Sequence, residues 1–109
     1  MIRTKQVGEQ LIIYLRGRLD VQLSAEVERE INEILEKHPK GDVVINLAEV
    51  EYMSSSGLRV LVAVMRILKA NSRRLKLCQL NSPVRKIFEV VELMDMFDIY
   101  ETEEEALAS

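Results

Sequence analysis

Tyr52-Met53-Ser54-Ser55-Ser56-Gly57-Leu58 separates a predicted buried strand, residues 42–47, from the most apolar predicted helix, residues 56–71. The stretch places three hydroxyl groups and a glycine where that helix begins. Unpaired backbone N–H groups and the positive end of the helix dipole meet there, so a first-turn serine can carry a phosphate with little strain. A plainer interpretation is that Ser54 or Ser55 caps the helix. The two roles are compatible, because one serine can cap while its neighbour is modified.

Upstream of this junction, the sequence predicts a hairpin and a helix. Residues 2–7 and 10–16 are extended segments on either side of a Gly-Glu turn, and Gly17 is expected to end the second of them. Apolar residues at spacings of three and four then predict a helix over residues 22–37. His38-Pro39 stops that helix, and His38 is expected to have a solvated or C-capping role.

Downstream, residues 75–80 alternate as a strand, and a third helix is expected with Ser82 as its N-cap and an apolar stripe that ends at Val91. A short strand over residues 98–101 and a terminal helix from Glu103 complete the pattern. Alternating strands and helices predict an α/β fold. We expect a mixed four- or five-stranded sheet with helices packed on it, in one domain spanning residues 1–109.

The helix that follows the serines is apolar on two sides. Its first stripe runs from Leu58 to Leu68, and its second comprises Val60, Ala63, Val64 and Ile67. Such a helix is either sandwiched in the core or leaves an apolar patch for a partner. In a chain of only 109 residues, an apolar patch for a partner is a serious alternative to burial in the core. Five basic residues border the same region: Arg59, Arg66, Lys69, Arg73 and Arg74.

Composition excludes several classes of function. A formal net charge of -3 argues against a dedicated nucleic-acid binder. One cysteine, Cys78, and one histidine at unrelated places build no metal cluster, and phosphate-binding glycine motifs are absent from the sequence, so we expect neither an enzyme nor a cofactor. No apolar run reaches the length of a membrane span or a signal peptide, which predicts a cytoplasmic protein without membrane contact.

Four motifs occur in register along the chain: Gly17-Arg18-Leu19-Asp20, Val44-Ile45-Asn46-Leu47, Tyr52 to Leu58, and Ser82-Pro83-Val84-Arg85-Lys86-Ile87-Phe88. In order and spacing they resemble the STAS-domain family of bacterial anti-sigma factor antagonists. In that family the first serine after an aspartate is phosphorylated, and this position corresponds to Ser55. Ser54 stands at the aspartate position, and Arg18 stands where many members have glutamate.

The resemblance implies a partner-switching regulator of transcription. Unmodified, it would bind an anti-sigma factor that is also a serine kinase, and so free a sigma factor. Phosphorylation on Ser55 would end binding, and a PP2C-type phosphatase would reset the protein. Asp20 matches a family aspartate near the phosphorylation site that helps to contact the kinase. The expected partner-binding residues are Asp20, Ser54, Ser56, Gly57, Arg59, Val60 and Val64, with Val64 exposed.

Two alternatives remain open. Within the same fold, the second interpretation is a STAS subunit that is not switched by a kinase, as in a stressosome or a lipid-transport complex. From a different class, a cleft beside Asp20 and Ser55 would suit a small ligand or a nucleotide.

Overall fold

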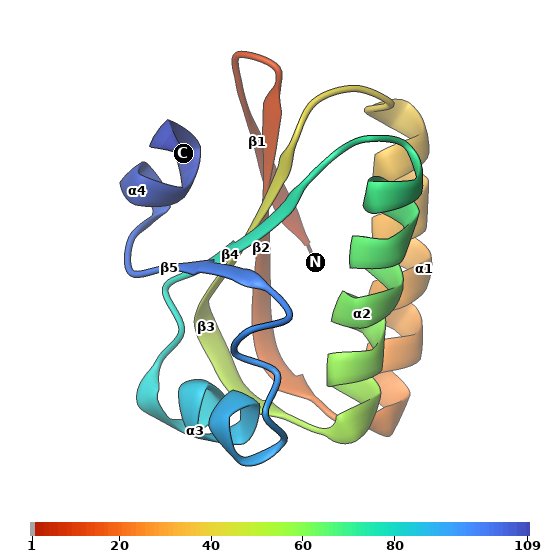
Figure 1. Ribbon diagram of the computed structural model, residues 1–109. Coiled ribbons are helices and arrows are strands. Elements are labelled where there is room, and N and C mark those ends of the chain that lie inside the picture. The colour runs from red at the N-terminus through yellow and green to blue at the C-terminus, as the bar shows by residue number, and fades with distance from the viewer. Residues whose placement is uncertain (1) are drawn as a thin grey trace.

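The computed structural model describes residues 2–109 and shows a five-stranded sheet with helices on both of its faces (Figure 1). Its strands lie in the order β1-β2-β3-β4-β5; β1 is antiparallel to β2, and the other neighbours are parallel. The α/β fold class is therefore confirmed. The elements are β1 (Arg3–Val7), β2 (Gln10–Leu19), α1 (Val21–Lys37), β3 (Val43–Met53), α2 (Ser55–Ala70), β4 (Leu75–Cys78), α3 (Ser82–Val90), β5 (Asp98–Tyr100) and α4 (Glu103–Ala108).

The two faces of the sheet bury different sets of residues, because neighbouring side chains on a strand point to opposite sides. Ile13, Ile45 and Leu77 are in register on adjacent strands and belong to the main core with α1 and α2. Ile12, Val44 and Cys78 form a smaller cluster with Ala106 of α4. In Figure 1, α1 and α2 lie side by side on one face of the sheet, and α4 lies on the other.

The sequence predicts that the second strand ends at Gly17. In the structure, β2 continues to Leu19. The pairing with β3 shifts register between Tyr14 and Arg16 and again after Gly17, whose φ of 84° is easily adopted by glycine. A glycine inside a strand is typical of such a bulge. The bulge lets β2 follow β3 to the pair Leu19–Met53, which brings the two strand ends together.

The expectation that Val60 and Val64 form an exposed patch is wrong. Val60 is 5% exposed and Val64 is 1% exposed, and both belong to the main core. Helix α2 contacts α1 as well as β3 and β4, so two of its sides are covered. The sandwiched alternative is correct for these two valines, whereas Ile67 of the same stripe is 42% exposed. Val60 and Val64 therefore present no surface to a partner.

Helix α3 begins one residue earlier than expected, with Asn81 rather than Ser82 as its N-cap. The Asn81 amide oxygen accepts a hydrogen bond from the Val84 N–H at 3.1 Å, and its amide nitrogen donates to the Val50 carbonyl at 2.6 Å. Asparagine can make both contacts at once, whereas a serine hydroxyl is too short to span them. Val91, expected in the apolar stripe of this helix, is 46% exposed and lies at its C-cap.

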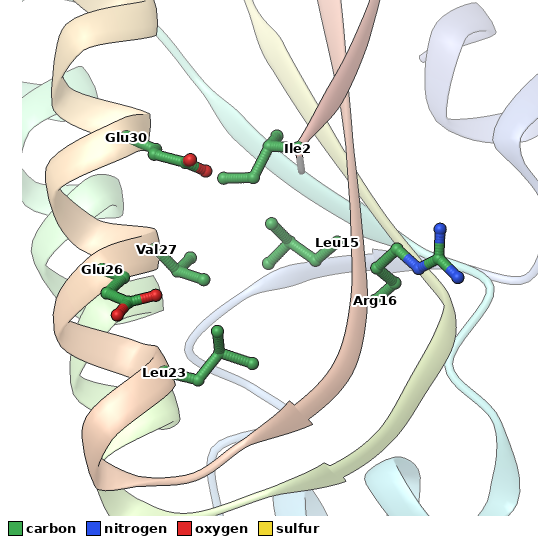
Figure 2. A pocket seen from close by; sticks show the side chains of 7 residues that line it. All are labelled: Ile2, Leu15, Arg16, Leu23, Glu26, Val27 and Glu30. Atoms are coloured by element: carbon green, nitrogen blue, oxygen red, sulfur yellow. The ribbon is translucent and has the colours of Figure 1, made fainter.

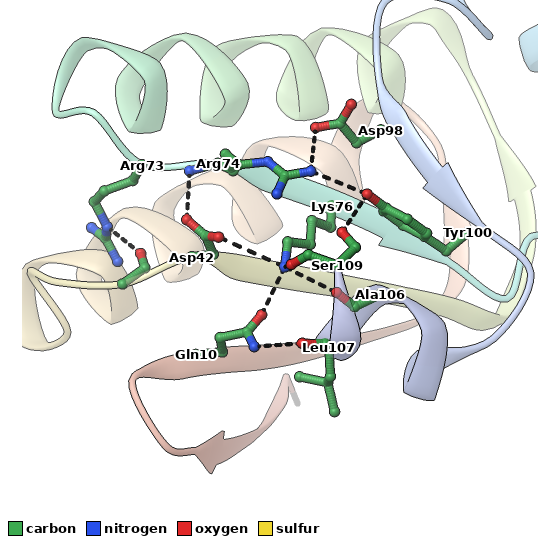
Figure 3. Close-up of polar contacts among 11 residues, drawn as sticks. Gln10, Asp42, Arg73, Arg74, Lys76, Asp98, Tyr100, Ala106, Leu107 and Ser109 are labelled. Atoms are coloured by element: carbon green, nitrogen blue, oxygen red, sulfur yellow. Dashed lines mark hydrogen bonds and ion pairs between the residues drawn. The ribbon is translucent and has the colours of Figure 1, made fainter.

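A fully buried lysine fixes α4 to the sheet. The Lys76 Nζ donates to the carbonyl oxygens of Ala106 and Ser109 at 2.9 and 3.0 Å, and to the Gln10 side chain at 3.0 Å (Figure 3). The Asp42 carboxylate lies 3.6 Å from the same nitrogen. A cation at the C-terminal end of α4 also opposes the negative end of the helix dipole. Within residues 2–109, none of the helices has the length and apolarity needed to span a membrane.

Candidate functional site

The candidate site lies where β2 and β3 end and α1 and α2 begin. Asp20 is the N-cap of α1, and its carboxylate accepts a hydrogen bond from the Leu23 N–H at 2.9 Å. Ser54 is the N-cap of α2 and accepts from the Gly57 N–H at 3.3 Å. Because Leu19 pairs with Met53, the two caps follow adjacent strand ends. The structure thus brings together Asp20 and the serine stretch, which are 34 positions apart in the chain.

The hydroxyl and the backbone N–H of Ser54 make three hydrogen bonds, and its carbonyl oxygen accepts a fourth from the Leu58 N–H at 3.1 Å. Its hydroxyl donates to the Leu19 carbonyl oxygen at 2.7 Å, in addition to accepting from Gly57, and its backbone N–H donates to the same Leu19 oxygen at 2.9 Å. Capping by Ser54 is therefore confirmed. The serine hydroxyl both donates and accepts here, a combination that an ionised carboxylate lacks.

Ser55 is exposed and opens the first turn of α2. Its hydroxyl has no hydrogen-bond partner within the described residues 2–109. Ser56, the next residue, is half-buried. Of the three serines, Ser54 is engaged in structure and Ser55 is the most accessible.

Gly57 is buried and has a structural reason to be glycine. A Cβ atom at this position would lie 2.8 Å from the Met53 Cγ, 3.0 Å from the Leu19 Cβ and 3.2 Å from the Leu19 carbonyl oxygen. The first turn of α2 therefore packs directly on the end of β2, so closely that a Cβ atom at this position would force Met53 or Leu19 to shift. Gly57 thus allows the start of α2 to lie close to the end of β2.

Arg18 lies at the edge of the site and stacks on an aromatic ring. Its guanidinium carbon is 4.7 Å from the centre of the Tyr52 ring, in a cation–π contact between β2 and β3. Both side chains are exposed. The Arg18 guanidinium is therefore held against a ring from the neighbouring strand.

A surface groove begins at Ser55 and follows α2. It is bordered by Ser55, Arg59 and Arg66, and its apolar lining comprises Leu58, Val62, Ala63, Val91 and Leu93. Asp20 is not part of its lining, so the groove does not join Asp20 and Ser55 into the ligand cleft that was considered from the sequence. Sequence reasoning missed Val91 and Leu93, because their apolar character predicts burial and gives no sign that they border a groove.

A second, small hollow lies between β2 and α1 (Figure 2). Ile2, Leu15, Leu23 and Val27 form its apolar lining, with the carboxylates of Glu26 and Glu30 at its edge. Arg16 also borders the hollow, but its guanidinium points away from the other lining side chains (Figure 2). Two carboxylates repel phosphate groups, so this hollow is unsuited to a nucleotide. Within residues 2–109, no three metal-binding side chains of the His, Cys, Asp or Glu type gather at one place.

The family model described as "STAS domain" matches residues 1–106 of the chain. An anti-sigma F factor antagonist of Paenibacillus polymyxa is 28% identical over 97 residues, which cover 89% of this chain and 83% of that protein. An anti-sigma-B factor antagonist of Staphylococcus epidermidis is 31% identical over 85 residues, which cover 78% of each. The chain belongs to the STAS domain family.

Solved structures agree with this assignment. SpoIIAA in its unphosphorylated form superposes with a TM-score of 0.79 at 26% identity, with 98% of this chain and 93% of that chain covered. The phosphorylated form of SpoIIAA, a Bacillus cell fate determinant, gives a TM-score of 0.72 at 26% identity over 99% and 97% of the two chains. An anti-sigma factor antagonist from Mycobacterium paratuberculosis, 21% identical, shares the fold with a TM-score of 0.86 over 99% and 91%.

Proposed function

We propose that this protein is an anti-sigma factor antagonist that acts by partner switching. In its unmodified form it binds an anti-sigma factor that is also a serine kinase, and a sigma factor is released. Phosphorylation of Ser55 ends that binding, and a PP2C-type phosphatase restores it. The chain is a substrate and a ligand in this scheme and has no catalysis of its own. Its expected setting is the bacterial cytoplasm.

One observation carries the proposal: Ser54 and Ser55 have separate roles. Ser54 caps α2 and binds Leu19, whereas the neighbouring Ser55 hydroxyl is exposed. A kinase can therefore reach Ser55 without breaking the hydrogen bonds that hold the loop. A phosphate on Ser55 would also sit at the positive end of the α2 dipole, which favours it by about 0.3 to 1 kcal/mol.

The same magnitudes indicate how the switch acts. A gain of less than about 1 kcal/mol leaves the fold nearly unchanged. A phosphate dianion enclosed in a protein interface without a new cationic partner costs several kcal/mol, comparable with the roughly 5.5 kcal/mol that reverses a 99:1 equilibrium. The switch should therefore work by excluding the partner from the surface around Ser55, with little refolding.

The partner surface, in this proposal, comprises the accessible residues of the site. Asp20 and Arg59 are exposed, and Ser54 and Ser56 are half-buried at the same junction. Gly57 is buried and contributes by letting the start of α2 pack closely on the end of β2. The Asp20 carboxylate accepts one hydrogen bond, from Leu23, and keeps further acceptor capacity for a partner.

The test is a binding and labelling experiment. The unmodified protein is used to isolate partners from its source organism, and a co-purifying kinase is then incubated with the protein and ATP. We expect one phosphate, on Ser55, and at least tenfold weaker binding of the kinase afterwards. Ser55→Ala should abolish labelling, whereas Ser56→Ala should be labelled normally. Labelling on Ser54 or Ser56 alone would contradict the assignment.

A further inference from the structure

Helix α2 carries cations that the fold does not use. Arg59, Arg66 and Lys69 are exposed, and none of them forms an ion pair within the described residues 2–109. The helix itself, Ser55–Ala70, contains no Asp or Glu. Two nearby arginines differ, since Arg73 donates to backbone carbonyls and Arg74 pairs with Asp98 at 3.2 Å.

Exposed apolar side chains lie beside these free cations. Val91 is 46% exposed and, with Leu93, forms the wall of the groove opposite α2. On the α2 side, Val62 lies between Arg59 and Arg66. Met96 is 48% exposed and borders a neighbouring hollow together with Lys69. The groove thus has an apolar lining with positive charge along one wall.

The spacing of the arginines restricts what fits. Arg59 and Arg66 are seven residues apart, which places both on one side of α2 about 10.5 Å apart along its axis. An amphipathic helix presents apolar residues in one stripe and carboxylates two turns apart at its margin with the same repeat. A membrane surface is a poorer match, because lipid-binding sequences cluster about four to eight basic residues.

We propose that the groove between α2 and the 91–93 segment docks an acidic amphipathic helix of the partner protein. The apolar stripe of that helix would contact Val62, Val91 and Leu93, and its carboxylates would pair with Arg59 and Arg66. The groove opens at Ser55, so the docked helix would lie next to the modified residue. The identification of this partner as the anti-sigma factor rests on the proposed function. The match between the groove and an acidic amphipathic helix is independent of that function.

Ser55 and Arg59 are four residues apart in α2, where helical side chains face each other. A phosphate on Ser55 would attract the Arg59 guanidinium and compete with the carboxylate of the partner. Phosphorylation would then weaken binding in two ways. The phosphate would exclude the partner from the surface around Ser55, and it would draw the Arg59 guanidinium away from the carboxylate of the partner helix. Arg66, two turns further along, would keep its charge available.

The test uses a synthetic 18-residue helical peptide with a leucine stripe flanked by glutamates, and a matched peptide with lysines instead. Calorimetry with the full chain should detect binding of the glutamate peptide. Amide NMR shifts should change in residues 55–69 and 91–96. The pair of substitutions Arg59→Glu and Arg66→Glu should weaken binding at least tenfold, about 1.4 kcal/mol. Arg29→Glu, an exposed reversal on α1, should change it less than twofold.

Circular dichroism on each variant checks that it is folded, and Arg59→Gln with Arg66→Gln provides a milder second variant. Equal binding of the two peptides, no effect of either arginine pair, or shifts elsewhere on the sheet would overturn the docking site. Binding to phosphatidylserine vesicles in place of the glutamate peptide would also overturn it, in favour of a lipid surface. Failure of Ser55 labelling with intact peptide binding would reject the proposed switch and leave the groove standing.

Discussion

The Ser54 hydroxyl donates a 2.7 Å hydrogen bond to the Leu19 carbonyl oxygen, and this contact joins the end of β3 to the end of β2. The same oxygen atom of Ser54 accepts from the Gly57 N–H and so starts α2. Asp20, the next residue after Leu19, starts α1. One side chain therefore fixes the relative position of two helix starts and leaves the neighbouring Ser55 exposed.

Ser54→Ala should destabilise the protein clearly, whereas Ser55→Ala should not. The first substitution removes an N-cap and leaves the Leu19 oxygen with one donor fewer, a loss of about 1 to 3 kcal/mol in the free energy of unfolding. The second removes an exposed hydroxyl, which usually costs under about 0.5 kcal/mol. Urea unfolding followed by circular dichroism measures both. Equal stability of the two variants would show that Ser54 does not hold the loop.

Gly57→Ala should destabilise the protein, against the ordinary preference of helices for alanine. In an open helix the change gains up to about 1 kcal/mol. Here the new Cβ meets Met53 and Leu19 at 3.0 Å or less, and such overpacking costs about 1 to 3 kcal/mol. Ser56→Ala, one residue earlier, is the matched control and should be nearly neutral. A stabilised Gly57→Ala variant would mean that α2 can move away from β2.

Lys76→Met should lower the free energy of unfolding by about 1 to 3 kcal/mol, because three acceptors lose a donor when the ammonium is removed. The Asp42 carboxylate remains satisfied in part, since it still accepts from the Arg74 N–H at 3.0 Å. Loosening should concentrate in α4, where faster amide hydrogen exchange is expected. Lys69→Met, on the exposed side of α2, provides the control. Unchanged exchange in α4 would argue that Lys76 does not fix that helix.

The stability of the protein should fall in alkaline solution through Cys78. Burial raises the pKa of the Cys78 thiol from 9.0 to about 12, with Glu103 and Glu104 adding to the shift. Below pH 9.0 the thiol is neutral in both folded and unfolded chains, so its contribution is fully present there. As the pH rises from 9.0 through about 12, the unfolded chain loses the proton first and stability declines.

Unfolding midpoints of the wild type and Cys78→Ala, measured from pH 7 to 11, should therefore converge or cross as the pH rises. The native thiol should also resist alkylation by iodoacetamide at pH 8, because it is buried and protonated. Rapid alkylation of the folded protein would contradict this description of Cys78.

Phosphorylation of Ser55 should alter the protein only locally. The phosphate adds about -1.5 to -2 charges at a helix start, and Arg59 is the nearest cation within the same helix. Amide NMR shifts should change around Asp20 and in residues 54–59, with affinity for the kinase falling at least tenfold. Widespread changes across α1 and α3 would instead indicate refolding.

Much of this architecture follows from local sequence patterns. The apolar spacing of residues 22–37 and the alternation of 75–80 depend on neighbours along the chain. The helix begins one residue earlier than expected, and the strand forms but ends two residues earlier, at Cys78. The cap at Ser54 is equally local, since a hydroxyl at a helix start can reach an N–H only three residues away. The four motifs in register are also a property of the sequence alone, and they were sufficient to predict the STAS domain family.

Only the tertiary structure decided which side of α2 is buried, because that depends on where α1 packs. Two apolar stripes alone could not separate the buried Val64 from a surface for a partner. The burial of Lys76 likewise depends on distant residues, because its ammonium donates to oxygens of Ala106 and Ser109, 30 or more positions away. Gly17 predicted a strand end, yet pairing with β3 carried the strand past it. Local preferences determine which segments become helices and strands. Burial and strand pairing act between distant residues, and they determine which face of each element is buried and where it ends.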